Sequence, residues 1–136
     1  MGIMQLFNRQ KSRAGVGRIL IVDDEEDLVS TIKSHLEWYN YEVSSAEDGR
    51  EGLEKAIEQK PDLILLDISM PNMNGHQMLE CVRKNPQLSE TPVIMLTALF
   101  EPADIEAASS CGINDYVTKP FELNELVNKI EAVLGG

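Results

Sequence analysis

Residues 63–75 read Leu63-Ile64-Leu65-Leu66-Asp67-Ile68-Ser69-Met70-Pro71-Asn72-Met73-Asn74-Gly75, and the rest of the chain is arranged around this stretch. An unbroken apolar run that leads into turn residues such as Pro71 and Gly75 is typical of a strand buried on both faces. Asp67 then stands at the carboxyl end of that strand, where ligands and chemistry collect in open α/β sheets. The stretch alone leaves a second interpretation equally open, in which Asp67 only caps the loop.

Similar strand-like runs recur along the chain, and helical patterns separate them. The predicted strands cover residues 19–22, 41–46, 62–66, 92–96 and 115–118. Apolar residues at helical spacing follow each strand, and in the second helix Leu53, Ala56 and Ile57 mark the apolar face. This alternation predicts an α/β fold with a five-stranded, parallel, doubly wound sheet and helices on both faces. Four runs are too apolar for sheet edges, whereas the run at 41–46 is typical of an edge.

The charge is divided between a short basic segment and an acidic remainder. The 136 residues carry a formal net charge of −11, with +4 in residues 1–18 and −15 in residues 19–136. We therefore predict a flexible basic tail over residues 1–17 and a single domain over residues 18–136. A basic amphipathic segment that touches a membrane or a partner is the alternative for the tail. An acidic domain is not expected to bind nucleic acid directly, because phosphate contacts need basic side chains.

Two further features of the sequence bear on where the protein works. The chain contains no apolar run as long as a membrane span and no signal-peptide segment at its start. Cys81 and Cys111 lack the spacing of a metal or redox motif, so we expect free thiols in a reducing compartment. Together these features favour a cytoplasmic protein.

Polar side chains stand at the ends of four predicted strands, namely Asp23 with Asp24, Asp67, Thr97 and Lys119. Because the carboxyl ends of parallel strands lie along one edge of a sheet, we expect these side chains to converge on one cleft. Carboxylates packed together repel one another unless a hard cation lies among them, and Mg²⁺ prefers such oxygen ligands beside a phosphate. A lysine and a hydroxyl opposite them could receive the oxygens of a phosphoryl group.

Each of these residues also has a simpler interpretation. Asp23 and Asp24 suit the acidic first turn of a helix, Thr97 suits a helix N-cap, and Lys119 suits a solvated surface position. Any one of them is weak support for a site. Their joint occurrence at strand ends is what favours the cleft.

Competing motifs fail on spacing. A calcium loop that begins at Asp67 would need an oxygen ligand in place of Pro71 and a glutamate in place of Met78. No serine or cysteine stands near a plausible base, and we expect His35 at a surface or boundary position and His76 to be exposed. The sequence therefore does not predict a hydrolase of the nucleophile-and-base type.

Five motifs stand in order along the chain: Asp23-Asp24, Asp67, Met70-Pro71 with Gly75, Thr97-Ala98, and Lys119-Pro120-Phe121. In these motifs the chain resembles the receiver domain of two-component response regulators, including the chemotaxis-type receivers. The resemblance covers residues 18–134 and implies a flavodoxin-like sheet with the strand order 2-1-3-4-5.

The resemblance implies that Asp67 is a phosphoacceptor that takes a phosphoryl group as an acyl phosphate. It also implies that Asp24, Asp67 and the backbone carbonyl of Ser69 ligate Mg²⁺ directly, while Asp23 acts mainly through a bound water. Mn²⁺ is the alternative cation.

The same resemblance assigns the phosphoryl-binding and switch positions. Lys119 pairs with a phosphoryl oxygen, Thr97 in the Thr97-Ala98 pair moves to hydrogen-bond another, and Tyr116 occupies the position of the family's switch aromatic. The Lys119–Pro120 peptide bond is expected to be cis, which X-Pro bonds tolerate.

The implied function is that of a phosphoprotein in a phosphorelay signalling system. A histidine kinase or a histidine phosphotransfer protein supplies the phosphate, and a face around residues 99–134 changes its binding to a downstream protein. We expect a single-domain regulator, because only two residues follow the last predicted helix. It is not expected to be an enzyme, although it assists its own phosphorylation and autodephosphorylation. The alternatives are a phosphate shuttle within a phosphorelay and a Mg²⁺-dependent aspartyl-phosphate phosphatase, which Ser69 disfavours because such enzymes carry an acid there. Homodimer formation is left open.

Overall fold

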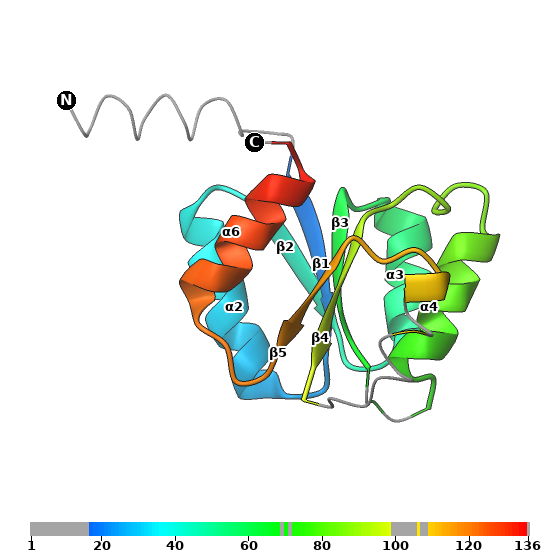
Figure 1. Cartoon of the computed structure of the whole chain (residues 1–136), viewed down its shortest axis with the longest axis horizontal. Helices are drawn as coiled ribbons and strands as arrows, with labels where there is room; N and C mark the ends of the chain where they lie inside the picture. Colours follow the sequence, from blue (N-terminus) through cyan, green and yellow to red (C-terminus); the bar gives the residue numbers. More distant parts are fainter. Residues whose placement is uncertain (1–16, 69, 71, 99–105, 107–108, 136) are drawn as a thin grey trace.

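The core of the protein is a five-stranded parallel sheet (Figure 1). The computed structural model describes residues 17–68, 70, 72–98, 106 and 109–135. The strands lie in the order β2-β1-β3-β4-β5, and every neighbouring pair is parallel. The predicted doubly wound α/β fold is therefore confirmed. The strands are β1 (Arg18–Val22), β2 (Glu42–Ala46), β3 (Leu63–Asp67), β4 (Val93–Thr97) and β5 (Asp115–Thr118).

Four helices of the described part of the chain cover the two faces of the sheet. Figure 1 shows α2 and α6 against one face and α3 and α4 against the other. The helix expected around residues 105–109 falls largely outside the described residues, as do residues 1–16 of the predicted tail. The helices are α2 (Glu26–Trp38), α3 (Gly49–Gln59), α4 (Gly75–Lys84) and α6 (Leu123–Val133).

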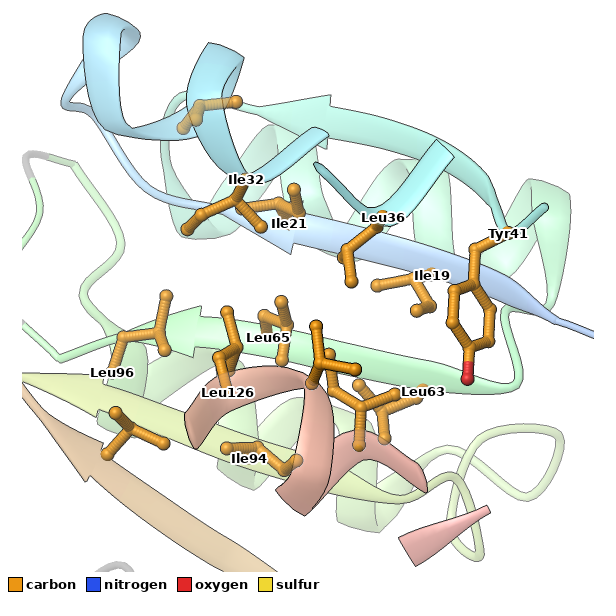
Figure 2. Close-up of a cluster of buried hydrophobic side chains, with 14 residues drawn as sticks. Ile19, Ile21, Ile32, Leu36, Tyr41, Leu63, Leu65, Ile94, Leu96 and Leu126 are labelled. Atoms are coloured by element: carbon orange, nitrogen blue, oxygen red, sulfur yellow. The ribbon is translucent and has the colours of Figure 1, made fainter. Parts of the chain in front are cut away.

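The apolar runs are unbroken because alternate residues of each central strand enter different cores. In β3, Leu63 and Leu65 face α2 and α6 (Figure 2), while Ile64 and Leu66 face α3 and α4. All five residues of β3 are buried, and all five residues of β4 are buried as well. A strand with helices on both sides has no polar face to show, which is why its sequence does not alternate.

The chain reverses its winding direction at β1, and this reversal determines where a crevice for the site can form. From β1 it passes to β2 on one side of the strand, and from β2 it returns to β3 on the other side. In a doubly wound sheet, the crevice at such a switch point lies outside the carboxyl ends of the strands. These ends lie along the lower edge of the sheet in Figure 1.

Three expectations are corrected by the structure. The edge assignment was right for β2 but missed β5, which is the other edge of the sheet although Val117 is buried under α6. Ile57 is 42% exposed, because α3 packs through Gly49, Gly52 and Ala56 and leaves the next position to one side. His76 is half-buried rather than exposed, since it follows Gly75, which is pressed against the end of β3.

Candidate functional site

The acidic pair after β1 divides into one buried and one exposed carboxylate. Asp23 is 2% exposed, and its backbone N–H donates to the carbonyl of Ala46 at the end of β2, over 3.1 Å. The Asp23 Oδ1 atom accepts the backbone N–H of Glu25 at 2.9 Å. Asp24 is exposed. Asp23 is thus fixed by the sheet and by the start of α2, whereas Asp24 faces solvent.

Asp67 is the last residue of β3, the central strand, and is 5% exposed. The loop that follows it returns closely to the strand, because the N–H of Gly75 donates to the carbonyl of Ile68 at 2.9 Å. A Cβ at position 75 would lie 2.2 Å from the carbonyl oxygen of Asp67, so only glycine fits. An Asn74–Gln77 capping box then starts α4.

Asp23, Asp24 and Asp67 form one acidic cluster. One carboxylate oxygen from each lies within 4.8 Å of the other two. Like charges at such distances disfavour one another in a partly buried site unless a cation compensates them. An all-oxygen donor set that keeps one exposed side is suited to Mg²⁺, which retains several of its waters. The expected carbonyl ligand, that of Ser69, lies outside the described residues.

More acidic groups lie beside the cluster. An open depression next to it is lined almost wholly by acidic residues of the β1–α2 connection, the first turn of α2 and the β2–α3 connection. A negative surface of this kind attracts cations. The lining residues are Asp24, Glu25, Glu26, Asp27, Glu47, Asp48 and Asn72.

Lys119 brings a positive charge to the cluster from the end of β5. Its backbone N–H donates to the carbonyl of Thr97 at 2.7 Å, and the Lys119–Pro120 peptide bond is cis. Its Nζ atom lies 2.8 Å from Asp23 Oδ2 and 3.6 Å from Asp67 Oδ2. Burial alone would lower the pKa of Lys119, but hydrogen bonds to Asp23 and Glu25 and the nearby carboxylate charges raise it above its usual value. Lys119 is therefore a firmly charged ammonium.

The other predicted switch residues lie at the end of β4, directly after it and within β5. Thr97 is the last residue of β4 and is 1% exposed, while the adjacent Ala98 is exposed. Tyr116 pairs with Met95 in the β4–β5 ladder and is 40% exposed. Most of the predicted output face between residues 99 and 108 lies outside the described residues.

Glu25 belongs to the site, and the sequence analysis missed it. Its Oε1 atom lies 2.8 Å from Lys119 Nζ, the same distance as the Asp23 carboxylate. The only signal in the sequence was its position directly after Asp23-Asp24. An acid at that place also suits the first turn of a helix, so the signal is weak.

Comparison with known proteins agrees with this geometry. A family model described as the response regulator receiver domain matches residues 19–131. The response regulator ArlR of Staphylococcus saprophyticus is 43% identical over 117 residues, which are 86% of this chain and 52% of ArlR. The uncharacterised transcriptional regulatory protein YkoG of Bacillus subtilis is 43% identical over 118 residues, 87% of this chain and 51% of that protein. The chain thus spans about half the length of these curated relatives.

Solved structures show the same fold over almost their whole length. The chemotaxis protein CheY4 of Vibrio cholerae superposes with a TM-score of 0.82 at 32% identity, covering 86% of this chain and 98% of CheY4. A CheY-like receiver domain protein of Methanospirillum hungatei gives 0.84 at 32% identity, covering 89% and 95%. In the described part of the chain, no helix has the length and apolar character of a membrane span. The chain therefore belongs to the response regulator receiver domain family, whose members accept phosphoryl groups in two-component signalling.

Proposed function

We propose that Asp67 is the phosphoacceptor of this receiver and that a histidine kinase or a histidine phosphotransfer protein supplies the phosphoryl group. The observation that carries the proposal is the position of Asp67, which lies at the end of the central strand beside two further carboxylates and within 3.6 Å of the Lys119 ammonium. A carboxylate is a weak nucleophile, so phosphoryl transfer to it depends on positioning and charge compensation. Both are features of this cleft.

In the proposed step, a carboxylate oxygen of Asp67 forms a bond to phosphorus as the phosphorus–nitrogen bond of the donor phosphohistidine breaks. The imidazole nitrogen keeps the electron pair of the broken bond, and the product is an acyl phosphate on Asp67. Asp24, Asp67 and the carbonyl of Ser69 would hold Mg²⁺, or Mn²⁺ in its place, and Asp23 would hold it through a water. The bound cation supplies charge compensation for the phosphoryl oxygens.

Lys119 and Thr97 are proposed to recognise the phosphoryl group once it is in place. Lys119 would turn one of its donors to a phosphoryl oxygen, and the Thr97 hydroxyl would approach another. Thr97 lies in the last position of β4, and its backbone carbonyl accepts the Lys119 backbone N–H, so the two residues are neighbours across the strand ends. The added charge would shift the population of the neighbouring surface, which includes Ala98 and Tyr116.

The consequence would be altered binding of a downstream protein by the face around residues 99–134. Direct binding of nucleic acid is not part of the proposal, because residues 19–136 carry a net charge of −15. We place the protein in the cytoplasm, where its phosphodonors work. The chain would turn over no other substrate, apart from assisting its own phosphorylation and dephosphorylation.

The test is labelling with a small acyl phosphate. Wild-type protein incubated with Mg²⁺ and acetyl phosphate, or with a cognate kinase, should gain the mass of one phosphoryl group, and EDTA should prevent the gain. Asp67→Asn should gain none. Asp62→Asn is the matched control, because Asp62 precedes the same strand at its opposite end and is exposed. A wild type that takes up no phosphate from any donor, or an Asp67→Asn variant that is still labelled, would contradict the proposal.

A further inference from the structure

Glu25 occupies the N-cap position of α2 without capping it. Its side chain makes no hydrogen bond to the first turn of the helix, although N-cap side chains commonly bond that turn. Its backbone N–H is held by Asp23 Oδ1 at 2.9 Å. With its backbone fixed in this way, the Glu25 carboxylate reaches across the strand ends and accepts a hydrogen bond from Lys119 Nζ.

Lys119 is held on the β1 side of the cleft by this contact. An ammonium has three donors, and two of them go to Asp23 and Glu25, each at 2.8 Å. The Asp67 carboxylate is 3.6 Å away, which is an ion-pair distance rather than a hydrogen bond. In this state Lys119 is thus hydrogen-bonded to the two acids of the β1 end and not to the phosphoacceptor.

The two contacts of Lys119 differ in how easily they can be exchanged. The Asp23 side chain is 0% exposed, so breaking that pair would leave a buried charge without a partner. The Glu25 side chain is 59% exposed, and water can replace Lys119 there at little cost. When Lys119 moves towards a phosphoryl group, the contact to Glu25 is therefore the one that breaks.

We propose that Glu25 is a positioning residue that holds Lys119 away from Asp67 and so sets how readily the cleft takes up a phosphoryl group. The inference rests on the proposed function, since it assumes that Lys119 recognises the group on Asp67. A contact present only in the unmodified state favours that state. Removing the contact therefore shifts the equilibrium between the two states towards the phosphorylated one, by the factor with which the contact had favoured the unmodified one.

The chain offers matched variants. Glu25→Gln removes the charge but keeps the shape, and Glu25→Asp keeps the charge but is too short by one methylene. Glu26→Gln removes an equal charge at the adjacent position, where Glu26 is exposed in the first turn of α2. The described ion pairs of Lys119 go to Asp23, Glu25 and Asp67, so Glu26 reports the long-range charge effect alone.

The measurement is the affinity for beryllium fluoride, a phosphoryl analogue, in saturating Mg²⁺ and enough salt to screen distant charges. Exposed ion pairs are modest, so Glu25→Gln and Glu25→Asp should each bind about two- to fivefold more tightly than wild type. Glu26→Gln should bind like wild type. In the metal-free protein, the ¹⁵N signal of the Lys119 ammonium should move in Glu25→Gln and stay in place in Glu26→Gln, a response that a merely structural role of Glu25 would not give.

Two outcomes would overturn the inference, and they are distinct. If wild type binds beryllium fluoride while Glu25→Gln binds no more tightly than Glu26→Gln, Glu25 does not position Lys119 and the proposed function stands. If wild type neither binds beryllium fluoride nor accepts phosphate, the proposed function falls and the role of Glu25 falls with it.

Discussion

Replacing Lys119 with methionine should lower the unfolding free energy of the metal-free protein by about 3 kcal/mol, because it leaves the buried Asp23 carboxylate without its cation. The Asp23 side chain is 0% exposed and lies 2.8 Å from Lys119 Nζ, while the Lys119 side chain is 12% exposed. Loss of one partner from a buried ion pair costs about 3–5 kcal/mol, and the partial exposure of Lys119 favours the lower end. The contact to exposed Glu25 adds little.

Magnesium should reverse part of this loss. A cation that binds only the folded state stabilises it by about 2.7 kcal/mol at one hundred times its Kd. Without Lys119, the three carboxylates lack a competing positive charge, so Mg²⁺ should bind more tightly and stabilise the variant more than the wild type. Urea unfolding followed by circular dichroism, in EDTA and in Mg²⁺, measures both effects. Lys129→Met is the control, because the Lys129–Asp115 pair at 3.0 Å is far more exposed and its loss should cost under about 1 kcal/mol in either buffer.

Equal destabilisation of Lys119→Met in EDTA and in Mg²⁺ would refute this reasoning. It would mean that the ammonium and the cation do not act on the same carboxylates. A loss below about 1 kcal/mol in EDTA would show that the Asp23 carboxylate is solvated rather than dependent on Lys119.

Two further substitutions test the scaffold, one beside the site and one at the opposite ends of β4 and β5. Gly75→Ala places a Cβ 2.2 Å from the Asp67 carbonyl oxygen and 2.8 Å from the Ile68 Cα, which are backbone atoms that cannot rotate away. It should lower the free energy of unfolding by about 3 kcal/mol and reduce acetyl phosphate labelling. Gly135→Ala strains a left-handed residue (φ 75°) but meets no atom within 4 Å, so it should leave labelling unchanged. Normal labelling of Gly75→Ala would contradict the close approach. Arg83→Met should lower the free energy of unfolding in urea by about 3 kcal/mol. Arg83→Lys should recover little of this loss, because only the forked guanidinium reaches both the segment before β4 and the segment before β5. A free-energy loss near zero would show that water can replace the guanidinium as donor to its four backbone acceptors, the carbonyls of Ser89, Thr91, Cys111 and Gly112.

The strands could be predicted from the sequence because burial on both faces leaves an unmistakable apolar run. Leu63 to Leu66 are fully buried, and the apolar run in the sequence identifies them directly. The number of neighbours that a strand has is a different property. β5 is hydrogen-bonded to β4 on one side only, yet its Val117 is covered by α6. The apolar residues of β5 therefore did not indicate that this strand is an edge. The strand order itself came from the family resemblance rather than from the pattern of residues.

The candidate site could be predicted where the backbone alone places a residue. Asp23, Asp67 and Thr97 end or directly follow strands, so the parallel sheet brings them together without further information. The contact between Lys119 and Glu25 depends instead on the conformations of two long side chains. The contact with Glu25 joins residues 94 positions apart and arises because Glu25 does not cap α2. No sequence pattern indicates that the Glu25 side chain contacts Lys119 instead of capping the helix.

The most direct test of the account is to locate the phosphoryl group itself. Wild-type protein labelled with acetyl phosphate in Mg²⁺ is reduced with borohydride, which converts an aspartyl phosphate to homoserine, and its peptides are then sequenced by mass spectrometry. If Asp67 is the phosphoacceptor, homoserine appears at position 67, the aspartates at positions 23 and 24 are unchanged, and no conversion occurs in EDTA. Homoserine at position 23 or 24, or a stable phosphate on a serine or threonine with Asp67 unmodified, would contradict it.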